Sequence, residues 1–151
     1  MKLVAESGSI TFESGSDSAC GIESGGDILL EARGSDNDLI INGNLVSSGG
    51  HITLDAGRDV DLNATLMTSD DGTVVVLSGG DTEIDDSIVT IDGDVLIKST
   101  GSITQTASIT SATGDVGLVS VGNIDQDANG DITTGGDVLI EAGGDWTMSG
   151  D

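Results

Sequence analysis

Aromatic residues, proline and cysteine are nearly missing from this chain of 151 residues. It has no proline and no tyrosine, and one residue each of phenylalanine, tryptophan and cysteine. Because aromatic side chains normally supply much of a globular core, their scarcity indicates a narrow core of aliphatic residues. A chain without proline keeps every backbone N–H available for sheet hydrogen bonds. The single cysteine, Cys20, excludes an internal disulfide framework, and we expect a small buried side chain there.

Positive charge is also scarce. The chain has 4 Lys and Arg residues against 27 Asp and Glu residues, which gives a formal net charge of −23 at pH 7. Such a surface repels phosphate backbones and anionic membranes, so we expect no nucleic-acid partner and no membrane insertion. It also discourages sideways association between sheets. We interpret most of the carboxylates as a solubilising coat.

Long apolar runs are absent as well. The first residues, Met-Lys-Leu-Val-Ala-Glu, lead into no apolar core of signal-peptide length, and no run reaches membrane-spanning length. The chain is therefore expected to be either cytosolic or an interior segment of a longer secreted protein. We favour the second interpretation, which places it outside the cell or at the cell surface.

The chain does contain a repeat, in which a glycine followed by alternating apolar residues recurs about every 21 residues. The phrases are GDILLEA, GHITLDA, GTVVVLS, GDVLIKS, GDVGLVS and GDVLIEA, and they start at Gly26, Gly50, Gly72, Gly93, Gly114 and Gly136. A fixed period of this length is typical of one structural unit that stacks on copies of itself.

Within each unit, apolar residues alternate with period two, as in a strand with one buried face. Counted from the glycine, the inward positions of a first strand are +2 and +4, with a small residue at +6. A second strand is expected near +10 and a shorter third strand after it, joined by turns rich in Gly, Asp, Asn and Ser. No stretch shows a helical apolar period. The pattern predicts an all-β parallel β-helix (β-solenoid) with three short strands per coil.

The solenoid is expected to be right-handed, because parallel crossovers are overwhelmingly right-handed. The long unit that opens at Gly26 should carry its extra residues in a turn around 35–38. Gly8 fits as a seventh start, with Ile10 and Phe12 in a first strand, and Leu3 and Ala5 in the third strand of an earlier coil. Residues 1–151 then form a single domain of about seven coils.

Three aspartates share the +1 position and are the candidate metal ligands: Asp94, Asp115 and Asp137. In successive coils they should lie about 4.8 Å apart. Like charges at that spacing can recruit a cation, and carboxylate oxygens in turns suit Ca²⁺. A second, partial column at +9 holds Asp59, Asp81 and Asp145, interrupted by Ser102 and Asn123. The alternative is that the carboxylates of both columns only keep the protein soluble. No cofactor other than Ca²⁺ is expected.

Catalysis is not expected, although some β-helices cleave polysaccharides with pairs of acidic residues. Carboxylate pairs occur at 85 and 86 and at 125 and 127, but with 27 acidic residues the proximity of two is expected by chance. Coils this uniform leave no long loop to wall a cleft. His51 replaces the usual aspartate at +1, where a lone histidine is typical of a solvated turn. We expect no catalytic residue, and a polysaccharide-binding or polysaccharide-cleaving β-helix remains the alternative, beside a calcium-binding module.

The phrases GGDILLEA, GGHITLDAGRDVDL and GGDVLIEAGGDWTM resemble the repeats of filamentous haemagglutinin-type adhesins. The resemblance covers Gly25 to the C-terminus and, more weakly, the first 24 residues. It implies the right-handed β-helical shaft of a large secreted bacterial protein that acts in adhesion or biofilm formation. Glycans and host or cell surfaces are then implied partners. The N-terminal secretion domain of that family is not recognisable in this chain.

Neither end of the predicted solenoid has a capping element, and uncapped ends expose unpaired strand edges. In the frame that begins at Gly8, the last unit stops after its second strand and residues 1–7 supply a third strand. The two ends would then complement each other. We therefore expect head-to-tail self-association into fibres, a contact that need not close.

Overall fold

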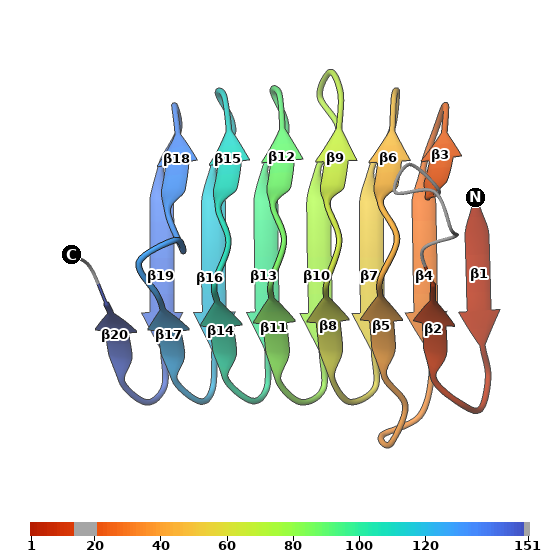
Figure 1. The fold of residues 1–151 in the computed structure, drawn as a ribbon, viewed down its shortest axis with the longest axis horizontal. Coiled ribbons are helices and arrows are strands. Elements are labelled where there is room, and N and C mark those ends of the chain that lie inside the picture. The colour runs from red at the N-terminus through yellow and green to blue at the C-terminus, as the bar shows by residue number, and fades with distance from the viewer. Residues whose placement is uncertain (14–20, 150–151) are drawn as a thin grey trace.

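The computed structural model describes residues 1–13 and 21–149, and all regular elements in these ranges are short β-strands (Figure 1). The strands form three parallel sheets. Sheet A contains β1 (Lys2–Ala5), β4 (Ile28–Ala32), β7 (Ile52–Ala56), β10 (Val74–Ser78), β13 (Val95–Ser99), β16 (Val116–Ser120) and β19 (Val138–Ala142). Sheet B contains β2 (Ile10–Phe12), β5 (Leu39–Ile41), β8 (Val60–Leu62), β11 (Thr82–Ile84), β14 (Ile103–Gln105), β17 (Ile124–Gln126) and β20 (Trp146–Met148). Sheet C contains β3 (Ile22–Ser24), β6 (Leu45–Ser47), β9 (Leu66–Thr68), β12 (Ile88–Thr90), β15 (Ile109–Ser111) and β18 (Ile132–Thr134).

Each coil passes through sheets A, B and C in turn, and about 22 residues return the chain to sheet A. In Figure 1 the chain descends through sheet A at the rear, rises through sheets B and C at the front, and steps toward the C-terminus with every turn, which makes the coil right-handed. The predicted all-β parallel solenoid is thus confirmed, with about six turns in place of seven. The ranges that the structure describes contain no helix that is long and apolar enough to span a membrane.

Equivalent residues of successive coils stack in register. In sheet A, Val74 pairs with Ile52 on one side and Val95 on the other, and all three side chains are buried. Because every inward position repeats this way, the core is a set of aliphatic columns that run the length of the solenoid. The six predicted coil starts from Gly26 to Gly136 each lie two residues before a strand of sheet A, as expected.

The coil start predicted at Gly8 is wrong. Residues 2–5 pair with 29–32 in sheet A, so Leu3 and Ala5 belong to a first strand. Ile10 and Phe12 pair with sheet B residues and belong to a second strand. Gly8 forms the corner between them, with a φ of 111°. The error arose because all three strands alternate with the same period, so the pattern fixes which face is buried but not which sheet a strand joins.

Two further features of the repeat follow from the stacking. The extra residues of the coil that opens at Gly26 lie between β4 and β5, where the turn insertion was predicted. The coil glycines serve mainly for close approach between turns: a Cβ on Gly93 would lie 2.1 Å from the carbonyl oxygen of Gly72. Among the described glycines, a positive φ occurs at Gly8 and Gly34.

Two glutamines, Gln105 and Gln126, stand in the inward column of sheet B that the other coils fill with apolar residues. The side-chain amide of Gln126 donates to Gln105 Oε1 at 2.8 Å and to the carbonyl of Gly130. The Trp146 indole in turn donates to Gln126 Oε1 at 2.8 Å. Within the described ranges no buried side-chain nitrogen or oxygen is left without a hydrogen bond. The glutamines thus fill the core column. Through its hydrogen bond to the Gly130 carbonyl, Gln126 also holds the wider turn between β17 and β18 against the core.

Candidate functional site

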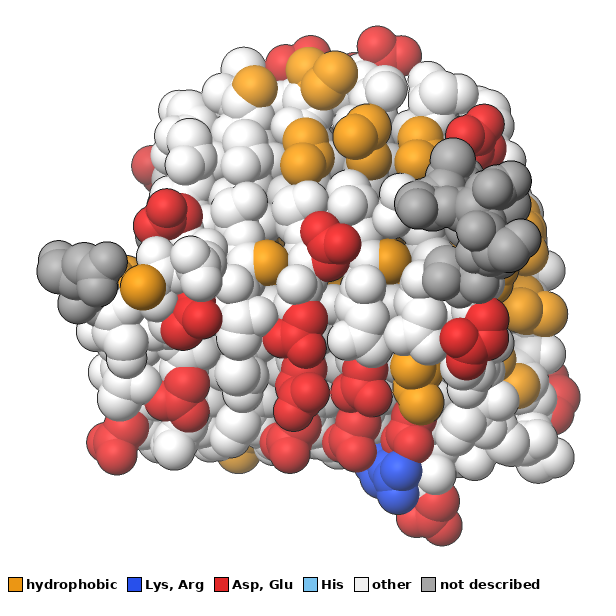
Figure 2. Space-filling view, in the orientation of Figure 1, with side chains coloured by type: hydrophobic (Ala, Val, Ile, Leu, Met, Phe, Trp, Pro, Cys, Tyr) orange, Lys and Arg blue, Asp and Glu red, His pale blue; other side chains and the backbone are white. Residues whose placement is uncertain are grey.

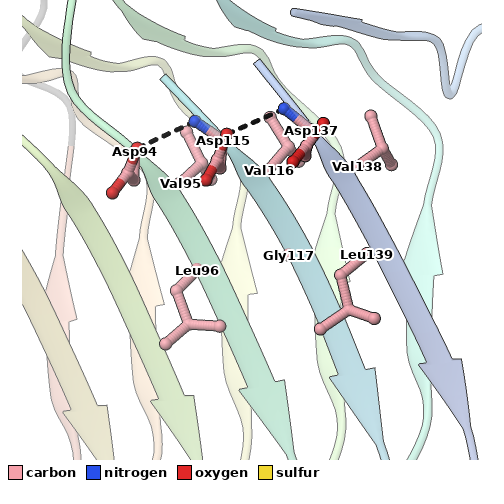
Figure 3. Close-up of a pocket in the computed structure, with 9 residues that line it drawn as sticks. All are labelled: Asp94, Val95, Leu96, Asp115, Val116, Gly117, Asp137, Val138 and Leu139. Atoms are coloured by element: carbon pink, nitrogen blue, oxygen red, sulfur yellow. Dashed lines mark hydrogen bonds between the residues drawn. The ribbon is translucent and has the colours of Figure 1, made fainter.

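The predicted aspartate column exists, and its members hold one another in place. Asp94, Asp115 and Asp137 lie side by side immediately before β13, β16 and β19, with their side chains exposed (Figure 3). Asp94 Oδ1 accepts the backbone N–H of Asp115 at 2.8 Å, and Asp115 Oδ1 accepts that of Asp137 at 2.7 Å. The carboxylates of Asp94 and Asp115 therefore each satisfy a donor that the strand ladder leaves free. The first role of the +1 residue is to link one coil to the next.

The same linkage explains His51. The backbone N–H of His51 donates to Asp27 Oδ1 at 3.0 Å, and His51 Nδ1 accepts the backbone N–H of Thr73 at 3.0 Å. The ring nitrogen thus stands where other coils place a carboxylate oxygen, which requires Nδ1 to be unprotonated. His51 acts as a member of the inter-coil ladder.

The +9 column is continuous over seven residues and is not interrupted. Each backbone N–H donates to the side-chain oxygen of the preceding member at 2.7–3.2 Å. The members are Ser9, Asp38, Asp59, Asp81, Ser102, Asn123 and Asp145. The serine and the asparagine continue the ladder because they also present an acceptor oxygen. Ser9 and Asp38 could not be recognised as members by counting from the glycines. Ser9 lies in the part of the chain whose frame was wrongly predicted, and the insertion before Asp38 moves it to +12.

Beside the aspartate column, the outer face of sheet A is hollowed. The hollow has a volume of about 290 Å³ and lies over Gly117, with Leu96 on one side and Leu139 on the other (Figure 3). The side chains of Asp94, Asp115 and Asp137 border its upper rim. A Cβ on Gly117 would lie 3.2 Å from Leu96 Cδ1, so Leu96 leans over the glycine. The arrangement combines apolar walls with negative charge at one edge.

Carboxylates also gather in rows over sheet B (Figure 2). Burial raises the pKa of Asp61, and the nearby charges of Asp38, Asp59 and Asp85 raise it further. Burial likewise raises the pKa of Glu83, with a further contribution from Asp61. Like-charge crowding of this kind costs stability at neutral pH.

The two arginines form ion pairs with four carboxylates, those of Glu6, Glu31, Asp38 and Asp59. A hydrogen bond from Arg58 Nε, 2.6 Å from Asp38 Oδ1, holds the pKa of Asp38 below its usual value. A hydrogen bond from Arg33 lowers the pKa of Glu31 in the same way. Both arginines are about half exposed, so these ion pairs contribute little to stability.

The geometry does not assemble a metal site from the candidate ligands. Within residues 1–13 and 21–149, no group of three or more His, Cys, Asp or Glu side chains is placed to hold a metal ion. The three aspartates form a row along the coil axis and do not converge on one point. The position predicted for Cys20 lies outside the described residues.

The carboxylate pairs that invited comparison with glycosidases have other partners. Asp85 accepts the Thr106 hydroxyl at 2.7 Å, and Asp86 accepts the Thr65 hydroxyl at 3.2 Å. Asp125 accepts the hydroxyl of Thr147. Each of these bonds joins two successive coils, so these carboxylates extend the ladders over the surface.

Comparisons with known proteins leave the family open: no protein-family model, no curated protein and no solved structure matches this chain.

Proposed function

We propose that the chain is a structural, non-enzymatic shaft segment of a bacterial surface adhesin or extracellular fibre. The observation that carries the proposal is the uniform stack, in which columns of core residues, ladder residues and glycines repeat from coil to coil. A solenoid of this kind can act as a spacer whose length depends on the number of coils, and it presents an extended surface. Further coils can be added because each coil contacts only its neighbours. The resemblance to filamentous haemagglutinin-type repeats supports the same role. Glycans and host or cell surfaces are the proposed targets.

The sheet edges support pairing with further coils. β1, β2 and β3 at one end and β18, β19 and β20 at the other each have a strand neighbour on one side only. At the second end, core columns end in exposed apolar side chains, among them Trp146 at 52% and Met148 at 62% exposure. Edges of this kind template the addition of another strand. We propose that another coil, in the simplest case that of a second copy, covers them.

The corrected strand assignment changes how two copies would fit. Because β1 is a first strand and β20 a second strand, β1 of one copy stacks on β19 and β2 stacks on β20. The edge of β18 in sheet C then receives no partner. The complementary ends expected from the sequence are therefore replaced by a joint with a gap one strand wide.

Light scattering over a range of concentrations, combined with electron microscopy of particle length, tests this self-association. We expect rods that lengthen along the coil axis as concentration rises. Trp146→Lys should shorten them, because a charge in an inward column at the edge opposes stacking. Val121→Lys is the control, since Val121 is 69% exposed and lies in the corner between β16 and β17, outside the strands at the open end. A native protein that stays monomeric at high concentration, or Trp146→Lys rods of native length, would overturn end-to-end assembly.

A further inference from the structure

We propose that the hollow over Gly117 binds the side chain of a lysine carried by a basic, extended segment of a partner protein. This inference does not depend on the assembly of fibres. It assigns a partner chemistry to the outer face of sheet A.

The hollow lies where the outward column of side chains on sheet A is interrupted by a glycine. The outward column of sheet A runs through Leu29, Thr53, Val75, Leu96, Gly117 and Leu139. Among these positions Gly117 alone lacks a side chain, so the space between Leu96 and Leu139 is open to a side chain from outside. The volume of about 290 Å³ lies just below the range for ligand pockets, about 300–1,000 Å³. It fits one side chain better than a large ligand.

The walls of the hollow are apolar. Leu96 is 37% exposed and Leu139 is 54% exposed, and both border the floor formed by β16 (Figure 3). A long aliphatic stem can lie between two such side chains while its polar end stays in water. Val119 and Val121, farther along the same chain segment, give an extended segment more apolar surface to cover. This surface favours a segment of a partner over a small free amine, which would bury little of it.

The rim of the hollow is negative. Asp94 and Asp115 each use Oδ1 to accept a backbone N–H, and none of the three rim aspartates forms an ion pair with another described residue. Their row does not converge as metal ligands do, which favours an organic cation. The net charge of −23 also attracts basic partners at long range.

The spacing selects lysine. Asp115 precedes Gly117 by two residues, which is about 6.6 Å along an extended strand. The four-carbon stem of a lysine covers this distance and brings its ammonium group to the rim. Arginine prefers a carboxylate with both oxygens free for two parallel hydrogen bonds, whereas Asp115, the rim aspartate that precedes Gly117, has one oxygen already engaged.

Nuclear magnetic resonance titration tests the proposal with the acetylated, amidated peptide Val-Thr-Lys-Thr-Val as probe. Its matched comparison is the same peptide with norleucine in place of lysine, at constant ionic strength. We expect saturable shifts of the backbone amide signals of Gly117, Leu96 and Leu139 with the lysine peptide, and much smaller shifts with the norleucine peptide. Absence of a saturable response to the lysine peptide would overturn the proposal.

Three variants separate the hollow from diffuse attraction to an acidic surface. Gly117→Leu restores the side chain that neighbouring coils carry and should weaken binding about tenfold or more. Asp115→Asn keeps the ladder acceptor but removes a charge, and should weaken binding to a smaller extent. Thr53→Leu, in the same column but away from the hollow, should bind as the native protein does.

The spectrum of each variant reports whether it is folded before the titration begins. Equal binding by native protein and Gly117→Leu would show diffuse attraction and overturn the proposal. If pentane-1,5-diamine bound as tightly as the lysine peptide, the assignment to a partner segment would be overturned.

Discussion

At the scale of single residues, the carboxylates next to the strands act as hydrogen-bond acceptors. Asp81 Oδ1 accepts the N–H of Ser102 at 2.7 Å, and its own N–H donates to Asp59 Oδ1 at 2.9 Å. The spacing of the +9 residues could be recognised in the sequence, but their hydrogen bonds to the backbone of the next coil could not. Spacing predicted that like residues stack, whereas the direction of each side chain toward the next coil is known only from the folded backbone.

Exchanging Asp81 for alanine should lower the free energy of unfolding by about 0.5–1.5 kcal/mol, because the Ser102 N–H loses its partner. Asp81→Asn keeps the acceptor and removes one charge from a crowded row, so it should match or exceed the native stability. Urea unfolding of the three proteins measures the difference. If Asp81→Asn lost as much stability as Asp81→Ala, charge and not the acceptor would be the important property.

At the scale of the strand and its turn, the glycines set how closely the coils approach. The nearest neighbours of a Cβ on Gly93 would be the carbonyl oxygen of Gly72 at 2.1 Å and its carbonyl carbon at 2.4 Å. Neither backbone atom can move without disturbing the strand pairing on either side. The repeat of glycine was the clearest signal in the sequence, yet its reason is contact between coils and, at most described positions, not an unusual φ.

Gly93→Ala should therefore destabilise the solenoid by about 1–3 kcal/mol through overpacking against backbone. Gly117→Ala is the matched control, because the closest neighbour of its added methyl group is the flexible end of Leu96 at 3.2 Å, and the nearest backbone atom is 4.0 Å away. Thermal or urea unfolding followed by circular dichroism measures both. A Gly93→Ala protein as stable as Gly117→Ala would mean that the turn shifts freely and that close approach is not required.

At the scale of the whole molecule, charge is distributed unevenly. Acidic side chains crowd sheet B around Asp61 and Glu83, whose pKa values are raised by burial and by neighbouring carboxylates. A carboxyl whose pKa is higher in the folded than in the unfolded state holds its proton more tightly when folded. Its effect on stability is unfavourable at neutral pH and is relieved as pH falls through the folded value.

We therefore expect the free energy of unfolding to rise as pH is lowered from 7 toward the ordinary carboxyl range near pH ~4. Below that range the rise should end, and protonation of Asp38 and Glu31, whose pKa values are lowered by half-exposed ion pairs, should reduce the stability only slightly. Urea unfolding across this pH range measures the profile. Glu83→Gln should reduce the rise on acidification, and Thr104→Ser, in the same column, should leave it unchanged. Stability that decreases steadily from pH 7 downward would contradict the expectation.

The sequence alone determined the class of the fold, the inward columns and most of the coil boundaries. It could do so because stacking makes each coil repeat the same alternation, so the signal from Ile52, Val74 and Val95 adds up along the chain. The tertiary structure decided which sheet residues 1–13 join, because a period of two is identical in all three sheets. It also decided what the aspartates bind and where Gly117 opens the surface, since both depend on side chains from neighbouring coils that lie about 22 residues away in the sequence.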